Sequence, residues 1–249
     1  MVVDHLLKFD ISFKPHECRA WYSNYYSLAL LTLSLCQDLF MAGTNTSAES
    51  MQWTIAELIN HPDVFKKVRE EIDLAVGRTR LVEESDIPNL PYLQAVVKET
   101  LRLHPPAPVA TRECRKNCKI GGFNIPEKTA VAINLYAIMR DPEIWDDPTE
   151  FRPERFLVPS KEQVDLDQTK GHNFNFVPFG GGRRGCPGTL LAFAMMNTTV
   201  AAIVQCFDWK LGGDGDGGKV DMQSGPGLSL SMLHPLKCHP IVHFNPFEG

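Results

Sequence analysis

Apolar residues recur at helical spacing in four stretches of the chain, with polar residues between them. Repeats at three- and four-residue intervals are typical of helices that bury one face. Prolines and glycines bound these stretches. His61-Pro62 closes the first, because the residue before a proline disfavours helical dihedrals, and Gly77 is a typical stop for the second. The pattern predicts helices over residues 38–60, 62–76, 91–103 and 187–207.

Short β-like runs replace the helical pattern between residues 112 and 135. They lie at residues 119–120 and 131–135, and turn formers such as Gly121-Gly122 separate them. A further strand-like run lies near residues 228–232. The expected fold class is therefore mainly α with a small β-sheet.

The first 36 residues match no pattern that extends into the rest of the chain. Their most lipid-like run, residues 25–36, covers about a dozen positions, whereas a membrane-spanning helix needs ~20. This run is expected to be a core helix or an interfacial segment. We therefore divide the chain into an unassigned segment, residues 1–36, and one domain, residues 37–249.

Composition limits the classes of partner that the chain can bind and the roles that its cysteines can have. With 249 residues, 43% of them hydrophobic, the chain can bury a substantial core. A net charge of −5 offers no global basic excess, so nucleic acid is not an expected partner. Seven cysteines in a chain of this size do not indicate a disulfide framework, and their odd number leaves at least one thiol that needs another explanation.

The strongest chemical signal is the run FGGGRRGCPG, from Phe179 to Gly188, which delivers Cys186 to the start of a helix. Glycines allow positive φ and a close approach of the backbone to a flat ligand. A helix N-terminus favours negative charge and so holds a thiol as a thiolate. On haem iron, such a ligand favours cleavage of the O–O bond of dioxygen. Arg184 would then pair with a haem propionate and Phe179 would lie against the macrocycle; the alternative is a plain glycine-rich loop with a buried cysteine.

The pattern Phe-x-x-Gly-x-Arg-x-Cys-x-Gly resembles the signature of the cytochrome P450 superfamily. The residues of this segment are similar to those of the plant microsomal members of the family. Two further motifs occur in the family's order. Glu99-Thr-Leu-Arg102 resembles its Glu-x-x-Arg, and residues 151–156, FRPERF, resemble its later Pro-Glu-Arg-Phe. The resemblance implies that Glu99, Arg102 and Arg155 form a buried structural triad that braces the cysteine loop. Taken alone, Glu99 and Arg102 would be an exposed helix pair worth ~0.2–0.5 kcal/mol.

Residues 42–47, AGTNTS, resemble the family's distal helix motif, in which the helix is loosened where oxygen binds. Thr46 would be the alcohol that takes part in proton delivery. The sequence departs from the family at Asn45, where an acid is common, and an amide cannot donate and recover a proton as a carboxylic acid does. The alternative is a small polar helix turn in a packing groove.

The segment that follows the Glu-x-x-Arg helix, residues 105–111, is apolar and stiffened by prolines. In the family this region lines the substrate cavity, and Arg112 beside it would reach a propionate. The prolines also serve as a plain helix stop. The remaining metal-like spacings, Cys114 with Cys118 and Cys238 with His239 and His243, do not complete a four-ligand zinc pattern, so we expect core or surface residues there.

The resemblance implies the C-terminal, haem-binding part of the cytochrome P450 fold, truncated at its N-terminus and lacking the membrane anchor. It implies haem b bound through Cys186, Phe179, Arg184, Gly188 and Arg112. The implied activity is a monooxygenase of plant specialised metabolism that inserts one atom of dioxygen into a small apolar substrate. An NADPH-dependent flavoprotein reductase would supply electrons at the cytoplasmic face of the endoplasmic reticulum. The alternatives are a truncated, inactive remnant, or a haem-thiolate isomerase or dehydratase.

Overall fold

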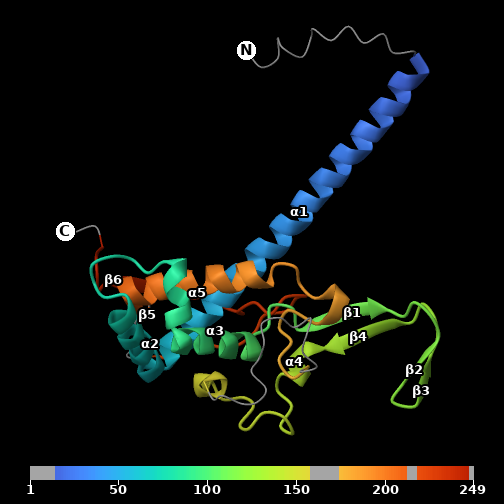
Figure 1. The fold of residues 1–249 in the computed structure, drawn as a ribbon. Coiled ribbons are helices and arrows are strands. Elements are labelled where there is room, and N and C mark those ends of the chain that lie inside the picture. The colour runs from blue at the N-terminus through green and yellow to red at the C-terminus, as the bar shows by residue number, and fades with distance from the viewer. Residues whose placement is uncertain (1–14, 158–173, 212–217, 247–249) are drawn as a thin grey trace, which may run out of the picture. The chain divides into compact units, whose positions relative to one another are not determined.

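The computed structural model describes residues 15–157, 174–211 and 218–246, and side chains from residue 30 onward. The chain forms two compact units, Met1–Thr44 and Asn45–Gly249. The division falls after residue 44 rather than at the predicted boundary near residue 36. The second unit carries the described sheets and the buried core (Figure 1).

The first helix is longer than predicted. Helix α1 (Pro15–Asn60) has 46 residues and begins far upstream of residue 38. In the first unit its described apolar side chains are exposed, including Leu30, Leu33 and Phe40. The expectation that the lipid-like run is a core helix is therefore wrong for its described residues, 30–36, which are all exposed.

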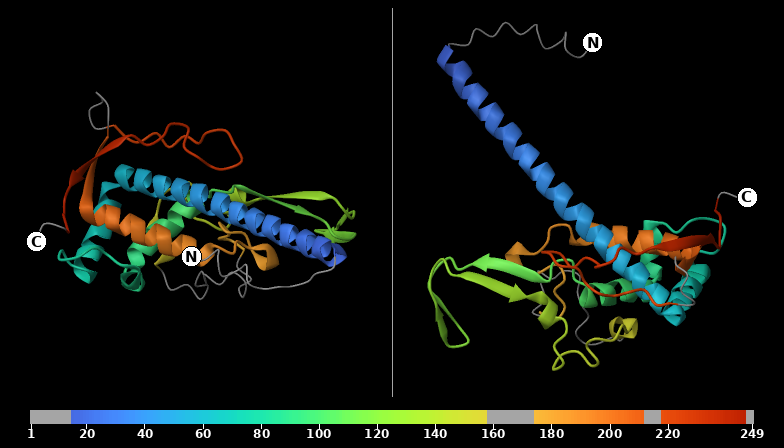
Figure 2. Two further views of the ribbon diagram at one scale, coloured as in Figure 1. Left: turned by 90° about the horizontal axis from the view of Figure 1, so that it is seen from above. Right: turned by 180° about the vertical axis from the view of Figure 1, so that it is seen from behind.

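The three other predicted helices are confirmed. They are α2 (Pro62–Ala75), α3 (Pro91–Leu103) and α5 (Thr189–Cys206), each within two residues of the predicted limits. Pro62 and Pro91 open the first two, where a missing backbone N–H costs nothing. These three helices pack against one another in the second unit (Figure 2). Shorter helical turns connect the larger elements: η2 (Glu84–Asn89), α4 (Leu135–Ile138), η3 (Pro153–Phe156) and η4 (Gly182–Arg184).

The strands of the described residues form three two-stranded antiparallel sheets, so the predicted small β component is present but divided. Strand β1 (Val109–Glu113) pairs with β4 (Ala130–Asn134), and β2 (Cys118–Ile120) pairs with β3 (Phe123–Ile125) through a turn in which both glycines have positive φ. The third pair is β5 (Phe207–Leu211) with β6 (Cys238–Val242). The prediction of a strand near residues 228–232 is wrong. The structure describes an isolated β-bridge between Ser224 and Met232 there instead of a strand.

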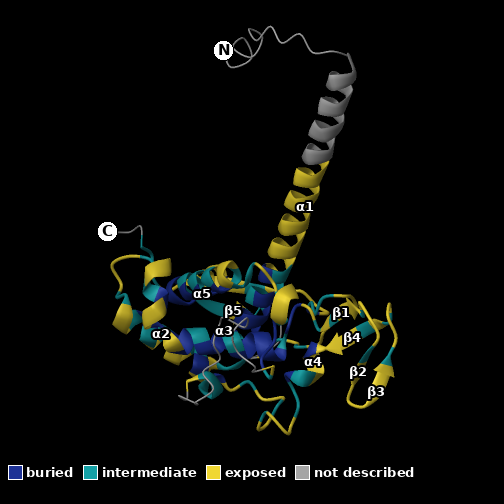
Figure 3. Ribbon diagram, turned by 45° about the vertical axis from the view of Figure 1, so that its right-hand side comes forward, coloured by how far each residue is buried: buried dark blue, intermediate teal, exposed yellow. Residues whose placement is uncertain are grey.

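Two clusters of buried apolar residues form most of the core. The first joins α2, η2, α3 and α5, and the second joins α3 and α5 to α4 and the segment before the glycine-rich loop (Figure 3). Helices α3 and α5 contribute to both clusters, so these two helices are the central elements of the second unit. Members of the second cluster are Val97, Leu101, Leu135, Met139, Phe176, Val177, Phe193 and Met196.

Helix α5 is, among the described residues, the one element long and apolar enough to cross a bilayer by length and composition. Val200, Ala201 and Val204 on this helix are fully buried in the first core cluster. The core therefore explains the apolar residues in the second half of α5, whereas Leu190 and Leu191 in its first turn are exposed.

Candidate functional site

Cys186 lies in a tight loop whose backbone is fixed at both ends. Gly180 and Gly182 adopt φ of 71° and 67°, in the left-handed region that side chains disfavour. The Cys186 N–H donates to the Phe179 carbonyl over 2.9 Å, which closes the turn around the four glycines between these residues. The thiol is exposed. The loop thus presents the sulfur outward from an anchored backbone.

The helix after the loop begins slightly later than the sequence suggested. Helix α5 starts at Thr189, whose hydroxyl donates to the Cys186 carbonyl over 2.9 Å. A Cβ added at Gly188 would lie 3.8 Å from the Cys186 sulfur. Glycine therefore leaves space beside the sulfur that a side chain would occupy.

Phe179 connects this loop to the core. Its ring is half-buried and packs against Phe193 of α5, with ring centroids 5.2 Å apart. Phe179 also contacts the second core cluster, to which Phe176 and Val177 belong. The residues immediately before the loop are therefore anchored in the core while the loop itself reaches the surface.

Arg112 and Arg184 come together although 72 positions separate them in the sequence. The Arg112 Nη2 atom on β1 donates to the Arg184 backbone carbonyl over 3.3 Å. Both residues are exposed. The Arg112 guanidinium thus lies against the backbone of the cysteine loop, and Arg184 adds a second exposed cationic residue within the loop, which makes this part of the surface favourable for an anionic ligand.

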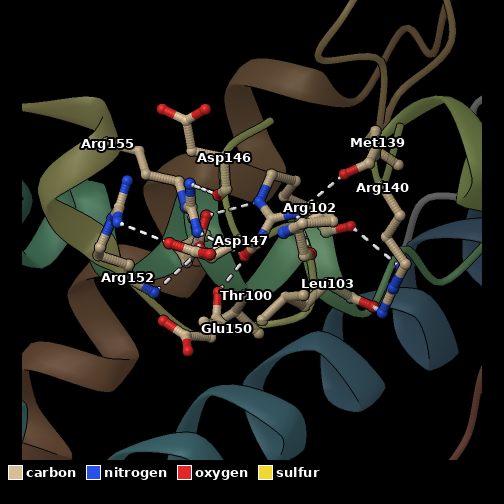
Figure 4. Close-up of polar contacts among 12 residues, drawn as sticks. Thr100, Arg102, Leu103, Met139, Arg140, Asp146, Asp147, Glu150, Arg152 and Arg155 are labelled. Atoms are coloured by element: carbon tan, nitrogen blue, oxygen red, sulfur yellow. Dashed lines mark hydrogen bonds and ion pairs between the residues drawn. The ribbon is translucent and has the colours of Figure 1, made fainter. Parts of the chain in front are cut away.

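Glu99, Arg102 and Arg155 also come together. Figure 4 labels the two arginines among the polar contacts of this region. Arg102 donates to both carboxylate oxygens of Glu99 over 2.8 Å, and the Arg155 Nε donates to the Glu99 Oε1 over 3.1 Å. The side chains of Glu99 and Arg102 are fully buried, and that of Arg155 is 6% exposed. The arrangement is a buried network and not the exposed helix pair that a motif of this spacing forms by itself.

The remaining donors of the triad bind backbone carbonyls of the segment between α4 and η3. Arg102 donates to Met139, Pro148 and Glu150, over 2.8 to 3.2 Å. Arg155 donates to the carbonyls of Asp146 and Asp147. The triad therefore attaches α3 to this irregular segment. Its described connection to the cysteine loop is indirect and runs through the second core cluster, which contains Met139 and Phe176.

Asn45 and Thr46 lie on α1 at the start of the second unit. Asn45 is exposed and Thr46 is half-buried. The helix is continuous through residues 42–47, so the expected loosening at this motif is not observed. The hydroxyls of Thr44 and Ser50 donate to carbonyls four residues earlier, Phe40 and Thr46, which satisfies these groups within a regular helix.

A second buried polar network has no counterpart in our sequence-based predictions. The Glu57 carboxylate accepts from the His104 Nε2 over 2.7 Å and lies 3.3 Å from the His61 Nδ1. Burial raises the pKa of Glu57, but the hydrogen bonds from the two histidines outweigh this and leave it below its usual value. The Trp53 ring stacks on His104 at 4.0 Å. In the sequence, the one sign of this network was His104, directly after the Glu-x-x-Arg helix. A single histidine does not indicate which residue it will bind.

These residues fit a haem group held through sulfur. Such a group requires an axial donor, cations for its propionates and apolar contacts for its ring. Cys186 supplies an exposed thiol, Arg112 and Arg184 supply cations beside it, and Gly188 leaves room next to the sulfur. The donor set thus matches the chemistry that the motif predicts.

Comparison with known proteins agrees with this chemistry. Residues 32–237 match the family model described as cytochrome P450. The chain is 48% identical to cytochrome P450 705A12 of Arabidopsis thaliana over 248 residues, which are 99% of this chain and 47% of that protein. That alignment includes the first 36 residues, although they carry no motif that we could interpret.

Two relatives from Glycine max are named after the reactions that they catalyse. The chain is 51% identical to a 3,9-dihydroxypterocarpan 6A-monooxygenase, over 84% of this chain and 40% of that protein. It is 50% identical to a beta-amyrin 24-hydroxylase, over 85% of this chain and 41% of that protein. The chain spans less than half the length of these curated relatives.

Solved structures agree on the fold. A zebrafish cytochrome P450 solved with abiraterone superposes with a TM-score of 0.71 at 33% sequence identity. The match covers 82% of this chain and 47% of the zebrafish chain. The matched part of this chain therefore shares its mainly helical fold, with small antiparallel sheets, with the zebrafish structure.

Proposed function

The chain belongs to the cytochrome P450 family, whose members bind haem b, and from this premise we propose that it forms the haem-binding part of a haem-thiolate monooxygenase. The observation that carries the proposal is the exposed Cys186 in a glycine-rich loop that contains Arg184 and whose backbone binds the Arg112 guanidinium. When haem is bound through a thiolate, it supplies cleavage of the O–O bond of dioxygen.

In this proposal the loop residues hold the cofactor. Cys186 supplies the axial sulfur. Arg112 and Arg184 each pair with a propionate, which is a charge-assisted interaction. Phe179 supports the loop from the core side, because its ring packs on Phe193. Gly188 leaves the sulfur free of a neighbouring side chain.

Proton delivery is proposed for Thr46 with Asn45. A threonine hydroxyl both donates and accepts a hydrogen bond, so Thr46 can hold a proton and pass it on. The Asn45 amide can orient a water molecule but cannot take part in proton exchange as a carboxylic acid does. We therefore propose that protons move through the Thr46 hydroxyl and water.

The proposed substrate, partner and location extend the family assignment. Two plant relatives are named as a monooxygenase and a hydroxylase, which supports insertion of one oxygen atom into a small organic substrate. The apolar residues 105–111 support an apolar substrate. An NADPH-dependent flavoprotein reductase is proposed as the electron donor, at the cytoplasmic face of the endoplasmic reticulum.

The experiment is the carbon monoxide spectrum of the haem-loaded, reduced chain. A thiolate-type shift of the Soret band is expected for the wild type and for Cys114→Ala, because Cys114 lies outside the glycine-rich loop. The shift should be absent in Cys186→Ala. If the shift persists in Cys186→Ala, or if the wild type binds haem without it, the proposal is wrong.

The amide at Asn45 favours a second candidate, a haem-thiolate isomerase or dehydratase that uses neither dioxygen nor reductase. Both candidates need Cys186, so the carbon monoxide spectrum does not separate them. Turnover that depends on NADPH and reductase supports the monooxygenase. Turnover of an oxygenated substrate without either supports the second candidate.

A further inference from the structure

Two thiols meet at the junction of two β-ribbons, away from the glycine-rich loop. Cys114 follows the last residue of β1, and Cys118 is the first residue of β2. Their sulfur atoms are 3.4 Å apart. In Figure 1 the β2–β3 hairpin extends outward from the β1–β4 pair, so the two sulfurs lie where one ribbon passes into the other.

The backbones of both cysteines are fixed by hydrogen bonds. The Cys114 N–H donates to the Thr129 carbonyl over 2.9 Å, and its carbonyl accepts from the Lys128 N–H over 2.7 Å. Cys118 is paired with Ile125 in the second ribbon. A disulfide has an S–S length of about 2.04 Å, so the sulfurs need to approach by about 1.4 Å.

The pair is accessible to a small reagent. Both cysteines are half-buried, and Cys118 lines an open surface cleft formed by residues of both strands of the hairpin. The hydrogen bond with the Cys114 sulfur raises the pKa of Cys118, so Cys118 holds its proton more tightly than an isolated thiol. Lys116 has the opposite, weaker effect on Cys118. The residues of the cleft are Asn117, Cys118, Lys119, Asn124, Ile125 and Pro126.

A metal site does not account for the pair. Within the described part of the chain, no group of three or more His, Cys, Asp or Glu side chains is placed to hold a metal ion. The common reaction of two close thiols without a third ligand is oxidation to a disulfide. In reducing compartments such disulfides are typically transient and sensitive to the redox state.

We propose that Cys114 and Cys118 form a reversible disulfide, with a low-molecular-weight disulfide such as oxidised glutathione as the oxidant. One protein thiolate attacks a glutathione sulfur, which forms a mixed disulfide and releases one glutathione thiolate. The second protein thiolate attacks the protein sulfur of the mixed disulfide, forms the Cys114–Cys118 bond and releases the second glutathione. The protein loses two electrons and two protons, and one molecule of oxidised glutathione takes them up and becomes two molecules of reduced glutathione.

The bond would close a five-residue ring, residues 114–118, and attach the end of β1 directly to the start of β2. Arg112 lies two positions before Cys114 on the same strand. Oxidation would therefore restrict the ribbon junction next to the strand that carries Arg112, without involving Cys186.

The test uses the whole chain, equilibrated in glutathione redox buffers, quenched with acid, alkylated and digested with trypsin. Trypsin cuts after Arg112, Arg115, Lys116 and Lys119, so the disulfide joins two tripeptides, ECR and NCK. Mass spectrometry should detect this linked pair in the oxidised sample and two alkylated tripeptides in the reduced sample.

The folded structure provides the sharper criterion, since any two nearby cysteines form some disulfide in an unfolded chain. We expect the equilibrium constant for cross-linking to be about tenfold larger in the native protein than in concentrated urea. Cys114→Ser and Cys118→Ser should each abolish the linked pair, and Cys238→Ser should leave it unchanged. Equal constants in the two states, or glutathione mixed disulfides without the linked pair, would overturn the proposal.

Discussion

Replacement of Glu99 by glutamine tests how much the buried triad stabilises the fold. The Glu99 Oε1 accepts from Arg102, from Arg155 and from the Arg152 backbone N–H, and its Oε2 accepts from the Arg102 Nε. An amide NH2 at either position faces a guanidinium donor, and the two arginines lose their buried counter-charge. Removal of one partner of a buried ion pair costs about 3–5 kcal/mol, which is a large share of a typical stability of about 5–15 kcal/mol.

The assay is urea unfolding followed by circular dichroism. With a slope of about 2–3 kcal/mol per M, the midpoint of Glu99→Gln should fall by about 1–2.5 M. Glu70→Gln is the matched control, because Glu70 is 60% exposed and pairs with Lys66 one helical turn earlier, an arrangement worth about 0.3–0.5 kcal/mol. A midpoint for Glu99→Gln as close to wild type as that of Glu70→Gln would refute the reasoning.

Three further predictions concern the core, the charged loop and the histidine network. Leu101→Ala should lower stability by about 2–5 kcal/mol because Leu101 is 1% exposed, whereas Leu228→Ala, at 99% exposure, should change it by less than about 0.5 kcal/mol in the same urea assay. Arg112→Ala should weaken haem binding by up to about fivefold in a spectral titration, since an exposed ion pair contributes at most about 1 kcal/mol; an unchanged affinity would remove Arg112 from the site. The hydrogen bond with Glu57 raises the pKa of His61 above its usual 6.5, so the stabilisation that His61 gives is complete below that pH and is lost as the pH rises through the raised value. The difference in urea midpoint between wild type and His61→Gln should therefore shrink between about pH 6 and about pH 9, and a constant difference would contradict this assignment.

The helices were predictable because their limits depend on local chemistry. Pro62 and Pro91 open helices at the positions where the sequence placed them, and α3 also ends at the predicted Leu103. The start of α1 was not predictable, because the residues before position 38 have no one-sided apolar pattern. Its described side chains there are exposed on all faces, so no packing requirement marks them in the sequence.

The third sheet escaped prediction because its pairing is remote in sequence. Strand β5 follows α5 without an intervening loop, so the helical pattern appeared to continue to Phe207. Its partner β6 lies at residues 238–242, and the 26 residues that separate the two strands are too many for a hairpin turn to indicate the pairing. The strand-like residues 228–232 instead lie near α1, where the Leu230 carbonyl accepts from the Trp53 indole.

The candidate site was predictable as a set of residues but not as a network. Motif order indicated that Glu99, Arg102 and Arg155 belong together, and the structure brings them together. The backbone carbonyls in residues 139–150 that accept from Arg102 and Arg155 could not be predicted from the sequence. Hydrogen bonds from side chains to a distant backbone depend on the completed fold. The Glu57 and His104 contact was missed for the same reason, since 47 positions separate the two residues.

The central claim is that the sulfur of Cys186 is the axial ligand of haem iron, and iron-edge X-ray absorption of the haem-loaded chain tests it directly. We predict one sulfur atom in the first coordination shell of the wild-type protein, at about 2.3 Å, the length typical of metal–thiolate bonds. In Cys186→Ser this sulfur should be absent, while Cys114→Ser should retain it. A wild-type spectrum with only nitrogen and oxygen ligands, or a sulfur signal that survives Cys186→Ser, would contradict the account.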